Sequence, residues 1–109
     1  MRFLTIALLF LASTSPVSIR VSNRIVQAGN STTVTCTVPR AAQNRKLEAV
    51  LFPYRASMVD LEGDTAPITH QFFFKSIPCE VTEATCRLTT DVGKQYAATV
   101  DILVSNCEP

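Results

Sequence analysis

The sequence predicts an all-β fold in which two sheets pack as a sandwich stabilised by disulfides. Several segments alternate apolar and polar residues with period two and are rich in β-branched side chains, as half-buried strands are. No stretch of ten residues has a convincing helical period. The 109 residues suffice for one domain and not for two, and the four cysteines are an even number.

The N-terminus has the order of a secretory signal peptide. Met1-Arg2 is a short basic start, the segment 3–12 is apolar except for Thr5, and small residues follow. Such a run is about half the roughly twenty residues that a membrane span needs. We therefore expect residues 1–17 to be a signal peptide, with a mature start between 14 and 19. Residues 18–109 would form the single domain of a secreted, extracellular or lumenal protein.

The first half of that domain predicts three strands. Residues 18–26 alternate in part, and 32–38 alternate strictly, with threonines on one face and valine and cysteine on the other. A polar connection follows at 39–45. The segment 47–54 is a third, more apolar strand that ends at Pro53.

The second half predicts a long loop and two more strands. Residues 57–67 read as a loop because they contain Gly63-Asp64 and a proline. The segment 68–77 is a fourth strand. The segment 95–104 has the clearest alternation of all, because every second residue from Tyr96 to Val104 is apolar or aromatic.

Composition excludes several function classes. The ten basic and nine acidic residues are scattered, so no basic face is available to displace counterions from a nucleic acid. No later segment is long enough to be transmembrane, so we do not expect an integral membrane protein. His70 is the only histidine, which leaves no basis for a catalytic set. We expect no enzyme activity, no metal and no cofactor.

The four cysteines predict two disulfides in an oxidising compartment. Cys36, Cys79, Cys86 and Cys107 allow three connectivities. A zinc site would need closer paired spacings and histidine ligands, which are absent. Asn30 begins the sequon Asn-Ser-Thr at a turn and is a candidate glycosylation site.

Two families resemble this chain. The strand VTCTV resembles the second strand of immunoglobulin-like domains, and DVGKQYAATV resembles their D-x-G-x-Y-x-C-x-V segment near the end. In that alignment Ala98 stands where the second cysteine belongs, and no Trp follows Cys36.

The second resemblance, to the ML (lipid-recognition) family, covers about residues 26–105. It rests on Cys79, six residues, Cys86, then Gly93 and Tyr96, and on AGNSTTVTCTVPRAAQNRKLEAVL upstream. It implies an immunoglobulin-like two-sheet sandwich, and the chain would be a shortened or divergent member. It also implies a local disulfide between Cys79 and Cys86, which leaves Cys36 for Cys107.

The same resemblance implies an apolar ligand, a sterol, fatty acid or phospholipid, held between the sheets. The candidate lining residues lie on the expected inward faces: Val34, Val38, Leu51, Phe72, Phe74, Tyr96, Ala98, Val100 and Ile102. Each could equally be an ordinary packed core residue. The alternative is a secreted immunoglobulin-like recognition or adhesion module that binds a protein partner and no small molecule. An enzyme inhibitor is a third possibility.

Overall fold

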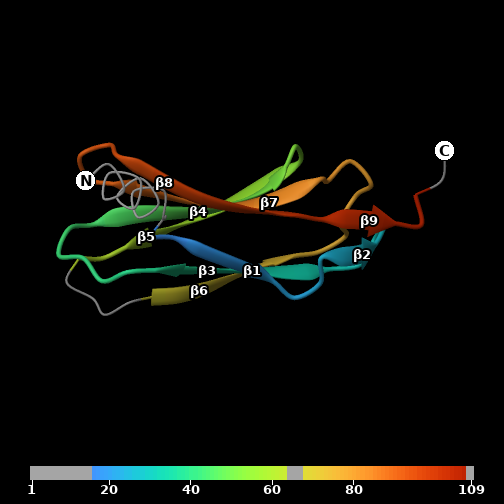
Figure 1. The fold of residues 1–109 in the computed structure, drawn as a ribbon, viewed down its shortest axis with the longest axis horizontal. Helices are drawn as coiled ribbons and strands as arrows, with labels where there is room; N and C mark the ends of the chain where they lie inside the picture. The colour runs from blue at the N-terminus through green and yellow to red at the C-terminus, as the bar shows by residue number, and fades with distance from the viewer. Residues whose placement is uncertain (1–15, 64–67, 108–109) are drawn as a thin grey trace, which may run out of the picture.

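The computed structural model describes residues 16–63 and 68–107, and within them the protein is built of strands with no helix (Figure 1). The strands are β1 (Ser18–Val21), β2 (Ile25–Gln27), β3 (Thr32–Val38), β4 (Arg45–Phe52), β5 (Arg55–Leu61), β6 (Ile68–Phe74), β7 (Glu83–Thr90), β8 (Gln95–Asp101) and β9 (Leu103–Ser105).

Two main sheets face each other. One has the order β1-β3-β6 and the other β5-β4-β7-β8, and all pairs in both are antiparallel. The short strands β2 and β9 pair in parallel at one end of the molecule (Figure 1). This order is that of an immunoglobulin-like sandwich, in which the strands lettered B and F lie in facing sheets, as β3 and β7 do here.

The core lies between the two sheets and follows from the period-two patterning. On β4 every second residue is buried, and Leu47, Ala49 and Leu51 are each 0% exposed. Val34 on β3 and Phe74 on β6 face them from the other sheet. The two-sheet, all-β prediction is therefore confirmed.

The disulfide pairing implied by the ML resemblance is wrong. Cys36 on β3 pairs with Cys86 on β7, with a Cα–Cα distance of 5.8 Å, and Cys79 pairs with Cys107 at 5.7 Å. Cys86 lies within a strand and its side chain points into the core, towards the facing sheet. Cys79 lies in the exposed connection before β7 and is bonded to Cys107, so a Cys79–Cys86 loop does not form.

The same finding corrects the immunoglobulin-like alignment by one strand. The cysteine that crosses to Cys36 is Cys86, and Ala98 is its neighbour on β8 in the sheet register. The segment that includes Gly93 forms the turn between β7 and β8 rather than the approach to the second cysteine.

Two further expectations about elements are corrected. Residues 57–61 belong to β5 and not to a loop, and residues 83–90 form a strand that was not predicted as an element of its own.

Residues 1–15 of the expected signal peptide lie outside the described residues. Val17, the last residue of the expected signal peptide, is 4% exposed and packs against the core.

Candidate functional site

The candidate ligand-binding residues all line or pack against the core. Six of them are buried: Val34, Val38, Leu51, Phe72, Phe74 and Ile102. The other three, Tyr96, Ala98 and Val100, are half-buried on β8. Phe73, on the opposite face of β6, is 63% exposed. Eight of these side chains thus lie on the inward faces of strands, and Ile102 lies between β8 and β9.

Two hollows on the described surface lie away from these nine residues. A hollow of about 490 Å³ is lined mainly by polar residues at the start of β4, the end of β5 and the β7–β8 connection, among them Lys46, Asp60 and Thr89. A second one, of about 390 Å³, lies beside Gly29 and Ser76. None of the nine candidate residues lines either hollow.

The middle of the sandwich is filled by the Cys36–Cys86 disulfide and its neighbours. Both cysteines are 0% exposed, and the disulfide directly joins the two sheets. His70, opposite Cys36 in the register, stacks obliquely on Phe72 with ring centroids 4.6 Å apart.

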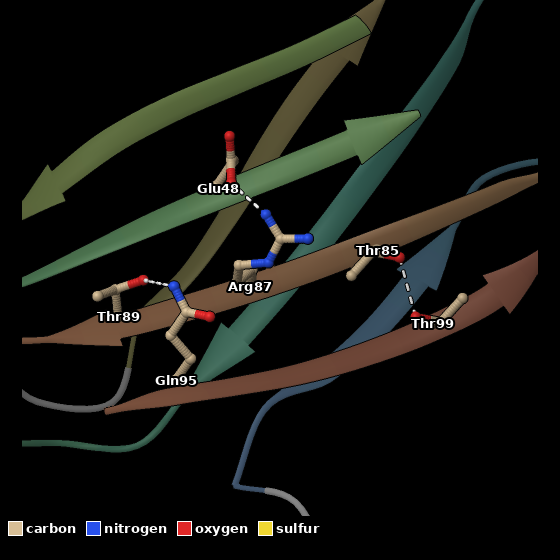
Figure 2. Close-up of polar contacts among 6 residues, drawn as sticks. All are labelled: Glu48, Thr85, Arg87, Thr89, Gln95 and Thr99. Atoms are coloured by element: carbon tan, nitrogen blue, oxygen red, sulfur yellow. Dashed lines mark hydrogen bonds and ion pairs between the residues drawn. The ribbon is translucent and has the colours of Figure 1, made fainter. Parts of the chain in front are cut away.

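The outer face of the four-stranded sheet carries a cross-strand set of polar contacts (Figure 2). The Arg87 guanidinium donates from Nη1 to Glu48 Oε1 at 2.9 Å, which joins β7 to β4. The hydroxyls of Thr85 and Thr99 lie 2.9 Å apart and join β7 to β8. Four residues further along the same strand pair, Gln95 Nε2 donates to Thr89 Oγ1 at 3.4 Å.

These contacts brace the side chains of the face in fixed positions. Glu48 and Arg87 are directly opposite in the β4–β7 register, as Thr85 and Thr99 are between β7 and β8. Such cross-strand pairs each contribute about 0.2–1 kcal/mol. Glu48 and Arg87 stay partly exposed whereas Thr85 is buried, so the face is polar and in part accessible.

An apolar edge adjoins this braced face at the β4–β5 hairpin. Phe52, Tyr54 and Met58 are 53%, 56% and 57% exposed. The Arg55 guanidinium lies over the Tyr54 ring, 5.0 Å from its centroid. Sequence reasoning missed these exposed side chains, because LEAVLFPY was interpreted as one apolar strand through Tyr54, whereas β4 ends at the exposed Phe52.

Asn30, the candidate glycosylation site, is exposed in the turn between β2 and β3. Its backbone N–H donates to the Gln27 carbonyl at 3.0 Å, and its carbonyl accepts from the Ile77 N–H at 2.8 Å. Because Asn30 is exposed, its side chain is accessible for modification.

Within residues 16–63 and 68–107, no group of His, Cys, Asp and Glu side chains could hold a metal ion. In the same residues there is no helix with the length and apolar character needed to cross a membrane. Comparison with protein-family models and with curated proteins finds no match to this chain. The case for function therefore rests on the geometry of the fold and its surface.

Proposed function

We propose that this domain is a secreted immunoglobulin-like recognition or adhesion module that binds a protein partner through the outer face of its four-stranded sheet. The observation that carries the proposal is the set of exposed apolar side chains on the β4–β5 hairpin, Phe52, Tyr54 and Met58, beside the braced polar face. The two disulfides fit an oxidising, extracellular environment.

The composition of this face suits protein recognition. Aromatic residues, methionine and arginine are enriched in protein interfaces, and the energetically dominant contacts are often aromatic or arginine side chains surrounded by polar groups. Here Phe52 and Tyr54 are exposed at the hairpin end of the sheet, and four residues back along β4 Glu48 accepts a hydrogen bond from the Arg87 guanidinium. A side chain fixed before binding loses less entropy when the complex forms.

The lipid-binding alternative draws on a different observation. Tyr96, Ala98 and Val100 form a half-buried apolar row on β8, which would be the entry point for a guest between the sheets. A guest of ten buried methylenes would gain about 8 kcal/mol before the costs of binding. It would have to displace a core already joined by Cys36–Cys86, and we therefore favour the recognition module.

The test separates the two functions. The exported protein is probed against an array of exported and cell-surface proteins of its source organism, and its mass is measured under native conditions. We expect saturable binding to a protein and a mass without lipid. Phe52→Ser should weaken this binding by about tenfold or more. The matched variant Phe73→Ser, on the outer face of the other sheet, should change it by less than about twofold.

Absence of any saturable protein partner would overturn the proposal. If lipid then co-purifies with the protein, and Val100→Phe abolishes uptake of a fluorescent sterol or fatty acid without lowering the melting temperature, the module is a lipid carrier. Equal loss of partner binding in Phe52→Ser and Phe73→Ser would also contradict the face assigned here.

A further inference from the structure

The outer face of the three-stranded sheet carries one exposed aromatic ring among polar residues. The residues of β3 that face away from the core are Thr33, Thr35 and Thr37. Phe73 lies opposite Thr33 in the register with β6 and is 63% exposed. Among the described residues it is the one large apolar side chain exposed on this sheet. A group that covered this ring would be stabilised by the apolar surface it removes from water.

A hollow of about 390 Å³ joins this ring to the sequon in the turn between β2 and β3. Its lining residues are Gly29, Asn30, Ser31, Phe73, Lys75 and Ser76. Asn30 precedes Thr33, the register partner of Phe73, by three residues, which is at most about 11 Å of extended chain. A group attached to the Asn30 side chain therefore begins at the hollow that the Phe73 ring also lines.

We infer that an N-linked glycan on Asn30 packs its first sugars over the Phe73 ring and fills this hollow. The sugar comes from a lipid-linked sugar diphosphate in the export pathway. The bond between Asn30 Nδ2 and the sugar C1 forms, the bond between C1 and the diphosphate oxygen breaks, and the amide loses one proton as the lipid diphosphate leaves. One face of a pyranose ring presents C–H groups, which are attracted to the negative face of an aromatic ring.

The chemistry of the hollow suits a sugar better than an apolar guest. Apart from Phe73, its lining residues are polar or glycine. The hydroxyls of Ser31 and Ser76 and the ammonium of Lys75 have the donors and acceptors that sugar hydroxyls require. A glycan is also tethered at Asn30, so it is held at a high effective concentration beside the ring and loses little translational freedom when it packs there.

The third residue of the sequon indicates when the sugar is added. Thr32 is 2% exposed, and its hydroxyl donates to the Asn23 carbonyl at 3.4 Å and lies 3.2 Å from the Ser22 hydroxyl. The sequon is recognised by its hydroxyl residue as well as by its asparagine, so transfer takes place during export, before β3 is packed. Asn30 itself stays exposed after folding, so the folded domain accommodates the attached glycan.

The test combines occupancy with stability. The full chain is exported from a eukaryotic cell line, and peptide mapping before and after enzymatic deglycosylation locates the glycan, which we expect on Asn30. The melting temperatures of the glycosylated protein and of Asn30→Gln are then compared. Asn30→Gln should melt about 4 °C or more below the glycosylated protein. In a Phe73→Ser background the same substitution should lower the melting temperature by less than about 1 °C, because the ring that the sugars cover is absent.

A matched variant and a direct structural measurement complete the test. Val92 is 82% exposed in the β7–β8 connection, so in a Val92→Ser background Asn30→Gln should keep its full effect. Sugar protons above an aromatic ring resonate upfield in the NMR spectrum, and this shift should disappear with Phe73→Ser.

An unoccupied Asn30 overturns the inference, as does an effect of Asn30→Gln that is equal with and without Phe73. The inference goes beyond the proposed function, because it concerns the outer face of the other sheet. None of its measurements involves a protein partner, so the two can fail separately.

Discussion

At the scale of single residues, Arg45 is a buried side chain whose nitrogens are mostly without hydrogen-bond partners among the described residues. It is 4% exposed at an inward position of β4, and its Nη1 donates to the Pro39 carbonyl at 2.7 Å. Its Nε and Nη2 are buried with no hydrogen-bond partner among the described residues. Burying donors without partners costs about 1–3 kcal/mol each, whereas the carbonyl of exposed Pro39 can bond to water instead.

Arg45→Met should therefore leave the free energy of unfolding unchanged or raise it by about 1 kcal/mol, since an apolar side chain of similar length fills the same space. Urea denaturation of the wild type and the variant measures the difference. Arg45→Ala is the control and should destabilise the protein, because it leaves a void. A loss above about 2 kcal/mol in Arg45→Met would contradict this account of Arg45.

At the scale of elements, the sequence predicted the strands whose two faces have different environments and missed those whose pattern is weak. The strand β3 alternates clearly because one face is core and the other is threonine. β5 has an exposed edge and face, so only Leu61 is buried and its pattern resembles a loop. β7 is central and its inward row contains Ala84 and Cys86, which are too small to give an apolar signal.

The hairpin between β7 and β8 gives the prediction for this scale. Gly93 has a φ of 86°, and a Cβ added there would meet nothing within 4 Å. The cost of Gly93→Ala is then conformational, about 1 kcal/mol, because an L-residue rarely adopts a left-handed backbone. Gly93→Asn should cost less, since asparagine tolerates this region better. Thermal unfolding of both variants measures the difference, and equal melting temperatures would contradict it.

At the scale of the whole molecule, the cysteines show where sequence reasoning stops. That all four would be bonded in a two-sheet sandwich follows from composition and alternation. Their pairing depends on which strands face each other across the core. The inward direction of Cys86 was not apparent while residues 83–90 were not recognised as a strand. The exposed apolar side chains of the β4–β5 hairpin were missed for a related reason. Alternation places Phe52 on the outer face of β4, but it does not show that β4 ends there and that Phe52 is exposed.

The two disulfides should differ in accessibility to a reductant. Cys79 and Cys107 are both exposed, whereas Cys36 and Cys86 are each 0% exposed in the core. Thiol–disulfide exchange requires the attacking thiolate to reach a sulfur atom. Mild reduction of the folded protein should therefore open Cys79–Cys107 first, and alkylation followed by peptide mapping should label those two cysteines alone.

Paired alanine variants extend this prediction to stability. On the loop-entropy model, closing 28 residues by Cys79–Cys107 contributes about 3.6 kcal/mol, and closing 50 by Cys36–Cys86 about 4.1 kcal/mol. Replacing Cys36 and Cys86 by alanine also leaves a cavity at the centre of the core, so this variant should be clearly the less stable of the two. Denaturant titration gives the order. A greater loss on replacing Cys79 and Cys107, or a mapped peptide that links Cys79 to Cys86, would mean that the disulfide between the sheets is not the main covalent support of the fold.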